Sequence, residues 1–432
     1  MQVHCKAEWD TLREVVVHRP GIEMFFGLLE PYASLYERAF SRYEARMEHE
    51  GLEQTLRHEF GISVIRLKED LLDAADRNPE IRQRMVEMAE EALCFSGEDG
   101  GVMHAREEFR KNADALDTGH FFNILLLNPC VDLHAVKNVR SIRLDITERQ
   151  PLVNLHYTRD QQVISDKGLV LSRMAKPQRE REVSLTGFFW EVYGAPVLHR
   201  TTAPATLEGG DFIPMQECAL IGEGERTNPE GVGQLLHNGI GFQEVGIVSQ
   251  PGHPLLPGEG PDPMITMHLD TYCNVASSGV AIGSVPLLRR ARVRVMGREG
   301  PGDYRFERET TLYDYLVEKE FSIIGITTLE QLAYASNFLA VRDGTIIAVE
   351  VDRVVRDVLK GLGEKAGQEP ERYGALLRQA RKDYEFLKRE GEFFPHKREV
   401  YQHDIDAYPI LLRNITGGYG GAHCMTCATR RG

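Results

Sequence analysis

The sequence predicts an α/β protein with a single core. Short apolar runs typical of strands alternate with short helical patterns along much of the 432-residue chain. The composition, 42% hydrophobic and 27% charged, is that of a globular protein rather than a disordered or fibrous one. Length alone would allow two or three domains. No clear linker, low-complexity segment or internal repeat divides the chain, so we expect one core over residues 1–432.

The first part of the chain predicts a strand and then helices. Residues 12–18 form an apolar run that ends at the Arg-Pro-Gly turn of 19–21. Residues 62–66 predict a second strand. A helix should begin at Asn78 and Pro79, with asparagine as N-cap and proline in the first turn. Four residues at i, i+4, i+7 and i+11 indicate one face of an earlier helix: Tyr36, Phe40, Tyr43 and Met47.

The region from about 69 to 148 predicts an inserted helical subdomain, because helical spacing continues through it. Short apolar runs between turn residues then predict strands at 168–172, 218–222, 244–248 and 279–283. Helices are expected between these strands at about 183–194 and 228–237.

The last third of the chain repeats this alternation. A helix at 311–320 leads into a strand at 322–327 and a hairpin that turns at Asp343 and Gly344. The highly charged stretch at about 352–391 predicts an additional helical segment.

Charge and missing motifs exclude several classes of function. The net charge is −14 and no long Lys/Arg run occurs, so we expect no nucleic-acid partner. No apolar stretch approaches the roughly 18 residues of a membrane helix, and the N-terminus has no secretory signal. Seven scattered cysteines predict a reducing cytoplasm rather than a disulfide framework. Without a phosphate-binding loop, a zinc-peptidase motif or four zinc ligands, neither a metal nor a cofactor is expected.

Four short segments concentrate polar residues between apolar neighbours: 154–160, 207–211, 267–271 and 417–427. In the last segment a glycine-rich run leads into Cys424. Glycines let a ligand approach the backbone closely, which suits an exposed nucleophile. A buried structural cysteine and a redox pair with Cys427 fit this segment equally well.

The other three segments supply groups for proton transfer and cation binding. His268 and Asp270 are two residues apart, so in a strand they would share a face, and a histidine beside a carboxylate suits acid–base catalysis. Asp160 and Glu208 are weak signals alone. Together, a thiol, an imidazole and several carboxylates fit a guanidinium, a planar cation that paired carboxylates bind through its N–H donors. These groups predict a hydrolase in which a thiolate attacks the guanidinium carbon.

The order of these motifs resembles the arginine deiminase family. The resemblance rests on Thr158-Arg-Asp160, Glu208-Gly-Gly-Asp211, His268-Leu-Asp-Thr271 and His423-Cys-Met-Thr426, and extends to residues 12–21, 69–148, 174–182 and 224–227. It implies a five-bladed pseudo-symmetric α/β propeller (the pentein fold) with a helical insertion. It also implies hydrolysis of arginine to citrulline and ammonia through a covalent cysteine intermediate, without a cofactor. The only partner implied is the small guanidino substrate, and a homo-oligomer is left open.

The resemblance also implies roles for individual residues. Cys424 is similar to the nucleophile, while His268 and Glu208 resemble the pair that transfers protons. Asp160 and Asp270 resemble the carboxylates that clamp the guanidinium. The substrate-binding set that the resemblance implies is Asn154, Arg179, Arg226, Asp211 and Tyr419.

Tyr419 departs from the family pattern, because arginine deiminases usually have an arginine five residues before the nucleophile. A phenol cannot form the charged fork of an arginine. We therefore expect weaker binding of free arginine, unless Arg179 and Arg226 compensate or a cation from 352–412 fills the gap. The segment 324–332 also lacks the family's glycine-rich acidic turn. An arginine dihydrolase that yields ornithine, an amidinotransferase and a non-enzymatic binding protein remain as alternatives.

Overall fold

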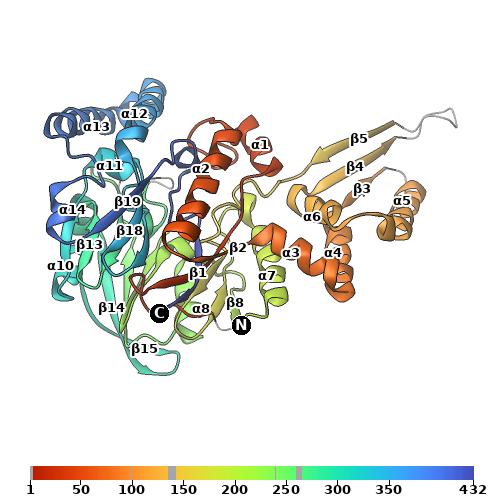
Figure 1. Ribbon diagram of the computed structural model, residues 1–432, viewed down its shortest axis with the longest axis horizontal. Helices are drawn as coiled ribbons and strands as arrows, with labels where there is room; N and C mark the ends of the chain where they lie inside the picture. The colour runs from red at the N-terminus through yellow and green to blue at the C-terminus, as the bar shows by residue number, and fades with distance from the viewer. Residues whose placement is uncertain (1–2, 98, 135–142, 239, 259–264) are drawn as a thin grey trace.

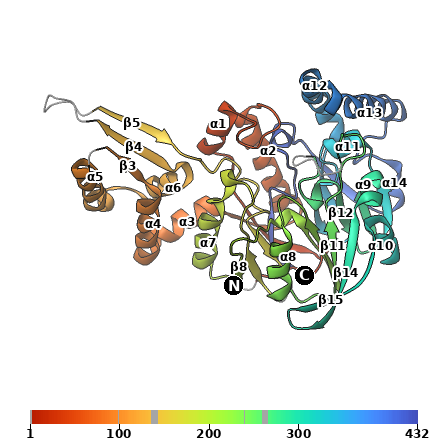
Figure 2. The ribbon, with the colours of Figure 1, turned by 180° about the vertical axis from the view of Figure 1, so that it is seen from behind.

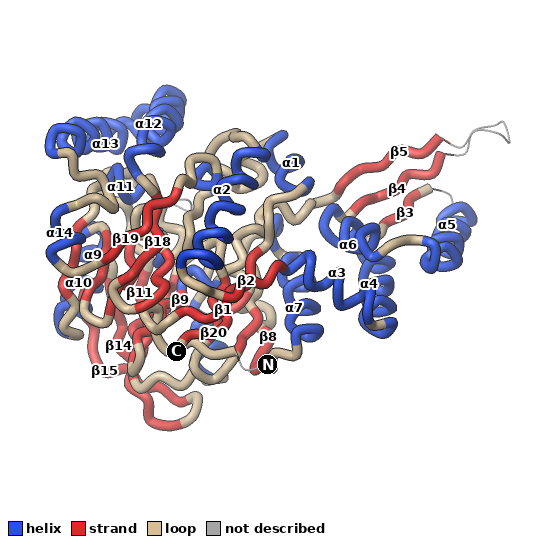
Figure 3. Tube along the Cα trace, viewed as in Figure 1, coloured by secondary structure: helices blue, strands red, loops and turns tan. Residues whose placement is uncertain are grey.

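The computed structural model describes residues 3–97, 99–134, 143–238, 240–258 and 265–432. In this part of the chain the strands form six small sheets, and most helices lie on the outside of the molecule (Figures 1 and 3). Five sheets belong to the main body. The sixth lies in an arm that projects from it, which Figure 2 shows from behind.

Every sheet of the main body has one antiparallel and one parallel pairing around its middle strand. In spatial order, three of these sheets are β2 (Ser63–Arg66), β1 (Leu12–Val17), β20 (Cys427–Arg431); β6 (Gln162–Ile164), β7 (Leu169–Leu171), β8 (Val197–Arg200); and β12 (Cys273–Ser277), β13 (Val280–Gly283), β16 (Ser322–Gly325). The other two are β17 (Leu339–Arg342), β18 (Thr345–Val349), β19 (Asp406–Ile410); and β15 (Asp303–Thr311), β14 (Arg292–Gly300), β11 (Glu244–Ser249), β10 (Cys218–Glu223), β9 (Phe212–Met215).

Helices connect the parallel strands of each sheet. Helices α1 (Ile22–Leu29) and α2 (Arg42–Gln54) lie between β1 and β2, α7 (Glu182–Tyr193) between β7 and β8, and α8 (Pro229–His237) between β10 and β11. Helices α9 (Val285–Arg290) and α10 (Leu312–Glu318) lie between β13 and β16. Helices α12 (Val351–Gln368), α13 (Pro370–Glu390) and α14 (Arg398–Gln402) lie between β18 and β19. A strand–strand–helix–strand order occurs within single stretches of chain at β6–β8, β9–β11 and β17–β19, whereas β14 and β15 interrupt the order at β12–β16 and the sheet of β1 and β2 takes its third strand, β20, from the C-terminus. The predicted α/β class is confirmed.

Local signals place many boundaries as predicted. Asn78 is the N-cap of α4 (Pro79–Ala92): its side chain accepts a hydrogen bond from the Glu80 N–H, and proline follows in the first turn. Helix α7 ends at Gly194, whose φ of 72° is unfavourable for other residues. The hairpin between β17 and β18 turns at Gly344, also with a positive φ.

The predicted helical face through Tyr36 and Met47 is wrong. Residues 31–41 form turns, and α2 begins only at Arg42 because the Ser41 side chain accepts a hydrogen bond from the Glu44 N–H and caps the helix. Tyr36 is buried and donates a hydrogen bond to the Val153 carbonyl at 2.6 Å. The turns carry this residue into the core, whereas Tyr43 and Met47 on α2 are exposed.

The projecting arm contains strands as well as the predicted helices. Its helices are α3 (Leu67–Arg77), α4, α5 (Asp99–Asn112) and α6 (Thr118–Leu127), and its sheet is β3 (Cys94–Ser96), β4 (Pro129–His134), β5 (Arg143–Glu148). The expectation of helix alone is therefore wrong at these three strands. Residues 131–134 alternate apolar and polar side chains, a period-two pattern that favours a strand.

The charged stretch predicted as helical forms α12 and α13, which pack on each other and on α11 (Thr328–Leu332) beside the main body (Figure 1). Helix α12 buries Val354, Val355, Val358 and Leu362 in the apolar cluster that also contains Cys424. Burial of these side chains fixes one face of α12 against the region that leads to Cys424. None of the described helices combines the length and apolarity required to cross a bilayer.

Candidate active site

In four of the five main sheets, a short irregular segment with a predicted site residue precedes an edge strand, and these four segments converge at one place. Asp160 precedes β6, Glu208 precedes β9, His268 precedes β12 and Cys424 precedes β20. Asp160, His268 and Cys424 line a small cavity, and Glu208 contacts His268 from outside its wall. Its walls comprise Leu35, Asn154, Tyr157, Asp160, Arg179, Arg226, Met267, His268, Gly418, Tyr419 and Cys424.

Cys424 is buried in the wall of this cavity. Its Sγ lies 3.5 Å from Asp270 Oδ2 and 3.0 Å from Asn337 Nδ2. Burial, and then the charges of Asp270 and Asp160, raise the pKa of the Cys424 thiol well above its usual value. The thiol is therefore protonated at neutral pH until a cation enters the cavity.

Cys427 has different surroundings. It lies in β20 opposite Val16 and packs in a separate apolar cluster from Cys424. Burial raises the pKa of its thiol to about 12. Both cysteines are free thiols, which gives the redox-pair interpretation no support.

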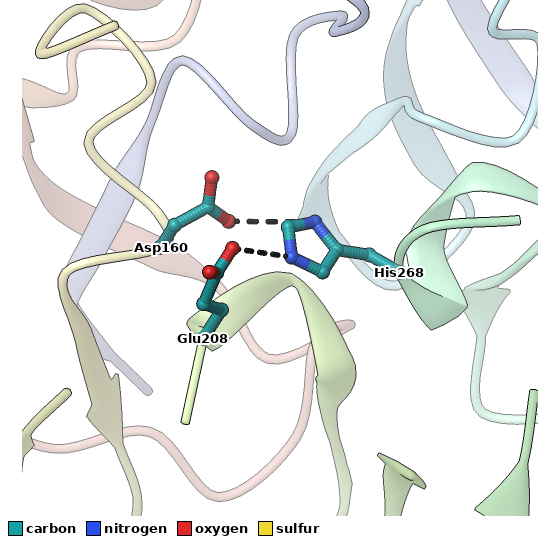
Figure 4. A group of neighbouring side chains, drawn as sticks. All are labelled: Asp160, Glu208 and His268. Atoms are coloured by element: carbon teal, nitrogen blue, oxygen red, sulfur yellow. Dashed lines mark hydrogen bonds and ion pairs between the residues drawn. The ribbon is translucent and has the colours of Figure 1, made fainter. Parts of the chain in front are cut away.

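His268, Glu208 and Asp160 face one another, as Figure 4 shows. His268 Nε2 lies 2.9 Å from Glu208 Oε2, and Nδ1 lies 3.7 Å from Asp160 Oδ1. Burial opposes protonation, but the charge of Asp160 and the hydrogen bond to Glu208 raise the pKa of His268 to about 9. The imidazole is thus protonated at neutral pH and can act as an acid.

Asp270 lies beside Cys424, with Oδ2 3.5 Å from the sulfur. His268 and Asp270 would share a face in a strand, but residues Leu269–Thr271 form a 3₁₀ turn after His268. Asp270 Oδ2 accepts a hydrogen bond from His423 Nδ1 at 2.8 Å. Its Oδ1 is buried without a hydrogen-bond partner among the described residues. An unpaired buried carboxylate oxygen is costly, which indicates that a ligand donor pairs with it.

A buried chain of charges that the sequence interpretation missed supports this turn. His423 Nε2 lies 3.4 Å from Glu8 Oε1, and Glu8 accepts hydrogen bonds from Arg159 at 2.9 Å and Arg431 at 2.8 Å. The position of His423 directly before Cys424 could have indicated a role near the nucleophile. No sequence pattern indicates a role for Glu8, because its partners are distant in sequence.

The two predicted substrate-binding arginines line the cavity but contact the protein's own carboxylates. Arg179 Nη1 donates to Asp160 Oδ2 at 2.6 Å, and its other nitrogens donate to Glu182. Arg226 Nη1 lies 3.5 Å from Glu208 Oε2, while its Nε is buried without a hydrogen-bond partner among the described residues. Arg179 therefore forms an ion pair with Asp160, the carboxylate that was expected to bind the substrate guanidinium.

The remaining predicted binding residues are divided between the cavity and its surroundings. Asn154 lines the cavity and donates to the Ser34 carbonyl at 2.9 Å. Asp211 is not part of the cavity wall. Its carboxylate accepts hydrogen bonds from Thr227 and Gln250, both at 2.7 Å, and from the Leu269 N–H, so it braces neighbouring turns.

Tyr419 lines the cavity and also a neighbouring pocket. Its φ of 66° is in the left-handed region. Lys365 of α12 donates a hydrogen bond to the Tyr419 hydroxyl at 3.0 Å and lies 3.5 Å from Glu37. A cation from the stretch 352–412 thus stands next to Tyr419.

Asp160, Glu208 and His268 are the described residues whose ligand atoms, all within 4.8 Å of one another, could hold a metal ion. Arg179 and Arg226 already pair with the two carboxylates, and the raised pKa of His268 favours its protonated form. These cationic groups make a metal ion a poor fit.

Comparison with known proteins shows the family. The arginine deiminase family model matches residues 33–431. Arginine deiminase of Halobacterium salinarum is 26% identical, with 100% of this chain and 97% of that protein covered. Arginine deiminase of Oenococcus oeni is 23% identical, with 85% of this chain and 92% of that protein covered.

Two solved structures have the same overall fold, each with a TM-score of 0.51. The N-terminal domain of ArgZ bound to a reaction intermediate is 13% identical, with 97% of this chain and 98% of that chain covered. SxtG, an amidinotransferase from Microseira wollei, is 12% identical, with 99% and 97% covered. This chain belongs to the arginine deiminase family.

Proposed function

We propose that the protein hydrolyses the guanidino group of arginine to citrulline and ammonia through a covalent intermediate on Cys424. The observation that carries this proposal is the Asp270 carboxylate, whose Oδ2 lies 3.5 Å from the Cys424 sulfur and whose Oδ1 has no hydrogen-bond partner among the described residues. A guanidinium N–H bonded to this oxygen would hold its carbon beside the nucleophile. The chemistry of the cavity thus agrees with that of the proteins named arginine deiminase.

In the proposed reaction, Asp160 and Asp270 hold the substrate guanidinium. The bound cation offsets the carboxylate charges, so Cys424 loses its proton to solvent and the thiolate attacks the guanidinium carbon. His268 protonates the departing nitrogen, and ammonia leaves a thiouronium-type intermediate on sulfur. Neutral His268 then takes a proton from water, which adds to the same carbon, and the C–S bond breaks to release the ureido product.

We further propose that the five main sheets are the blades of a pseudo-symmetric propeller with one core over residues 1–432. The repeated pairing pattern of the five sheets supports this arrangement. Residues from about 69 to 148 are proposed as an inserted subdomain, and about 352–391 as an additional helical segment. Seven free cysteines support a reducing compartment such as the cytoplasm.

Amino-acid analysis after incubation with arginine tests the reaction, with and without an amine acceptor such as glycine. Citrulline formation that does not depend on glycine supports the proposal. Ornithine with release of carbon dioxide identifies a dihydrolase, and an amidino group found on glycine identifies a transferase. No turnover of arginine by folded protein contradicts the proposed reaction.

A further inference from the structure

Asn337 occupies the one equivalent position to which the sequence interpretation assigned no role. In four of the five main sheets, a site residue shortly precedes an edge strand. These residues are Asp160, Glu208, Asp270 and Cys424, before β6, β9, β12 and β20. In the remaining sheet the corresponding edge strand is β17, and Asn337 lies two residues before it. The fold therefore brings Asn337 to the same place as the other four.

The side-chain amide of Asn337 is fully engaged with the nucleophile loop. Its Oδ1 accepts hydrogen bonds from the Cys424 N–H at 3.1 Å and the Gly421 N–H at 2.9 Å. Because two donors face this oxygen, the amide can only be oriented with Nδ2 towards sulfur. Asn337 Nδ2 lies 3.0 Å from Cys424 Sγ, and the Asn337 side chain is buried.

We propose that Asn337 is a catalytic residue, whose amide N–H donates a hydrogen bond that stabilises the Cys424 thiolate while its carbonyl oxygen holds the nucleophile loop in place. The assignment rests on the proposed function only for the identity of the substrate. The contact with the reacting sulfur does not depend on it.

A neutral donor suits this position because the surroundings of sulfur are anionic. Asp270 Oδ2 is 3.5 Å away, and the negative charges of Asp270 and Asp160 oppose a second anion. A lysine or arginine beside sulfur would stabilise the thiolate but would repel a cationic substrate. An amide can donate a hydrogen bond to the thiolate without repelling the cationic substrate. Its bond is stronger to a thiolate than to a thiol, so it favours the reactive form and the sulfur leaving group.

The test uses two variants. Asn337→Asp keeps an oxygen for the two N–H groups but replaces the donor to sulfur by a charge. Asn337→Ala removes the donor without adding a charge, so a shift that reports the hydrogen bond must appear in both. In wild type and variants, iodoacetamide labelling of the Cys424 peptide is followed by mass spectrometry from pH 6 to 11 without substrate. We expect the midpoint of labelling to move to higher pH and the rate at pH 8 to fall about tenfold or more. The kcat for arginine should fall by a similar factor or more, with a smaller change in KM.

Asn274→Asp is the matched control. Asn274 is equally buried and bonds only to backbone groups of Val275 and Phe338, so the same change there should leave the Cys424 labelling midpoint unchanged. If Asn337→Asp does not fold, Asn337→Ala carries the test with the same expected shift. Labelling that falls by one factor at every pH, with an unchanged midpoint, would show that Asn337 only positions the loop and would overturn the proposal. A shifted midpoint in a protein without arginine turnover would uphold Asn337 and sink the proposed substrate.

Discussion

The residues that face the reacting atoms and the cations around the cavity occupy different positions relative to the strands of the main sheets. Asp160, Asp270 and Cys424 lie in short segments before the edge strands β6, β12 and β20, where turns and buried hydrogen bonds fix them. Arg179, by contrast, lies in the connection that follows a middle strand, as do Arg226 and Lys365. We call the first group, next to edge strands, the reaction end. We call the second group, in the longer connections between parallel strands, the recognition end.

This difference separates what the fold preorganises from what must rearrange. Among the residues that the structure describes, Asp270 Oδ1 at the reaction end has no hydrogen-bond partner. At the recognition end, the guanidinium of Arg179 is paired with Asp160 and Glu182. A substrate guanidinium that binds Asp160 Oδ2 must therefore compete with Arg179, because Arg179 donates to that oxygen while Oδ1 accepts from the Gly210 N–H. Arginine binding should accordingly involve movement of Arg179, and little movement of Asp270.

The largest effect should come from the nucleophile. Cys424→Ser should lower kcat by more than about a thousandfold without loss of fold, because a hydroxyl is a far weaker nucleophile than a thiolate. Citrulline assays measure the loss, and rapid quenching of wild type should trap an added mass on the Cys424 peptide. Cys427→Ser is the control and should keep most activity. An added mass on Cys427 instead would overturn the assignment.

The two clamps should then differ from each other. Asp270→Asn should reduce kcat/KM by about 2–5 kcal/mol in transition-state stabilisation, the usual cost of removing one partner of a buried charge pair. Asp160→Asn should cost less if Arg179 stays on Asp160 in the complex, and as much if the substrate displaces it. Steady-state kinetics of both variants decide between these cases. Near-normal kcat/KM in both would rule out a guanidinium clamp.

The pH dependence should report His268. Its pKa is raised to about 9, so the imidazole carries its proton below that pH and loses it as the pH rises through that value. We expect kcat/KM to fall on the alkaline side near pH 9. In Glu208→Gln the residual activity should fall at lower pH, because loss of the carboxylate lowers the pKa of His268. An alkaline limb that Glu208→Gln leaves in place would instead belong to another group, such as the Cys424 thiol.

The smallest effect should come from Lys365, which touches the cavity only through Tyr419. Lys365→Met should raise the KM for arginine about two- to fivefold, because it removes a cation near the substrate carboxylate without a direct contact. Lys360→Met, at an exposed position of the same helix, is the control. Agmatine, which lacks the carboxylate, should show no change. An equal rise in KM for agmatine would mean that Lys365 acts only on the fold.

The sequence was most informative where function depends on local patterns. The motifs that contain Asp160, Glu208, His268 and Cys424 could be singled out because their combination and order resemble the arginine deiminase family, although Asp160 and Glu208 are weak signals alone. Contacts between distant segments were less accessible. The contact of Asn337 with Cys424 across 87 positions had no local signal. The cation anticipated near Tyr419 could be narrowed only to 352–412 and not to Lys365, 54 positions away.

One local prediction failed for a physical reason, and one expectation depended on a strand that does not form. The spacing from Tyr36 suggested a helix, but the Ser41 cap starts that helix later. His268 and Asp270 would share a face in a strand, but the chain forms a 3₁₀ turn there, so the two side chains reach different partners. In both cases hydrogen bonds at a chain reversal outweighed the apolar period.

The pairing of β1 with β20 has a consequence for folding kinetics. Val16 lies opposite Cys427, and Thr429 bonds to Glu14 across 415 positions, so the strand that follows Cys424 is held by contacts of very long range. Such contacts close the largest loops and form late in folding. Refolding should therefore restore helical circular dichroism before citrulline formation, because the nucleophile loop acquires its anchor only when the two distant strands meet.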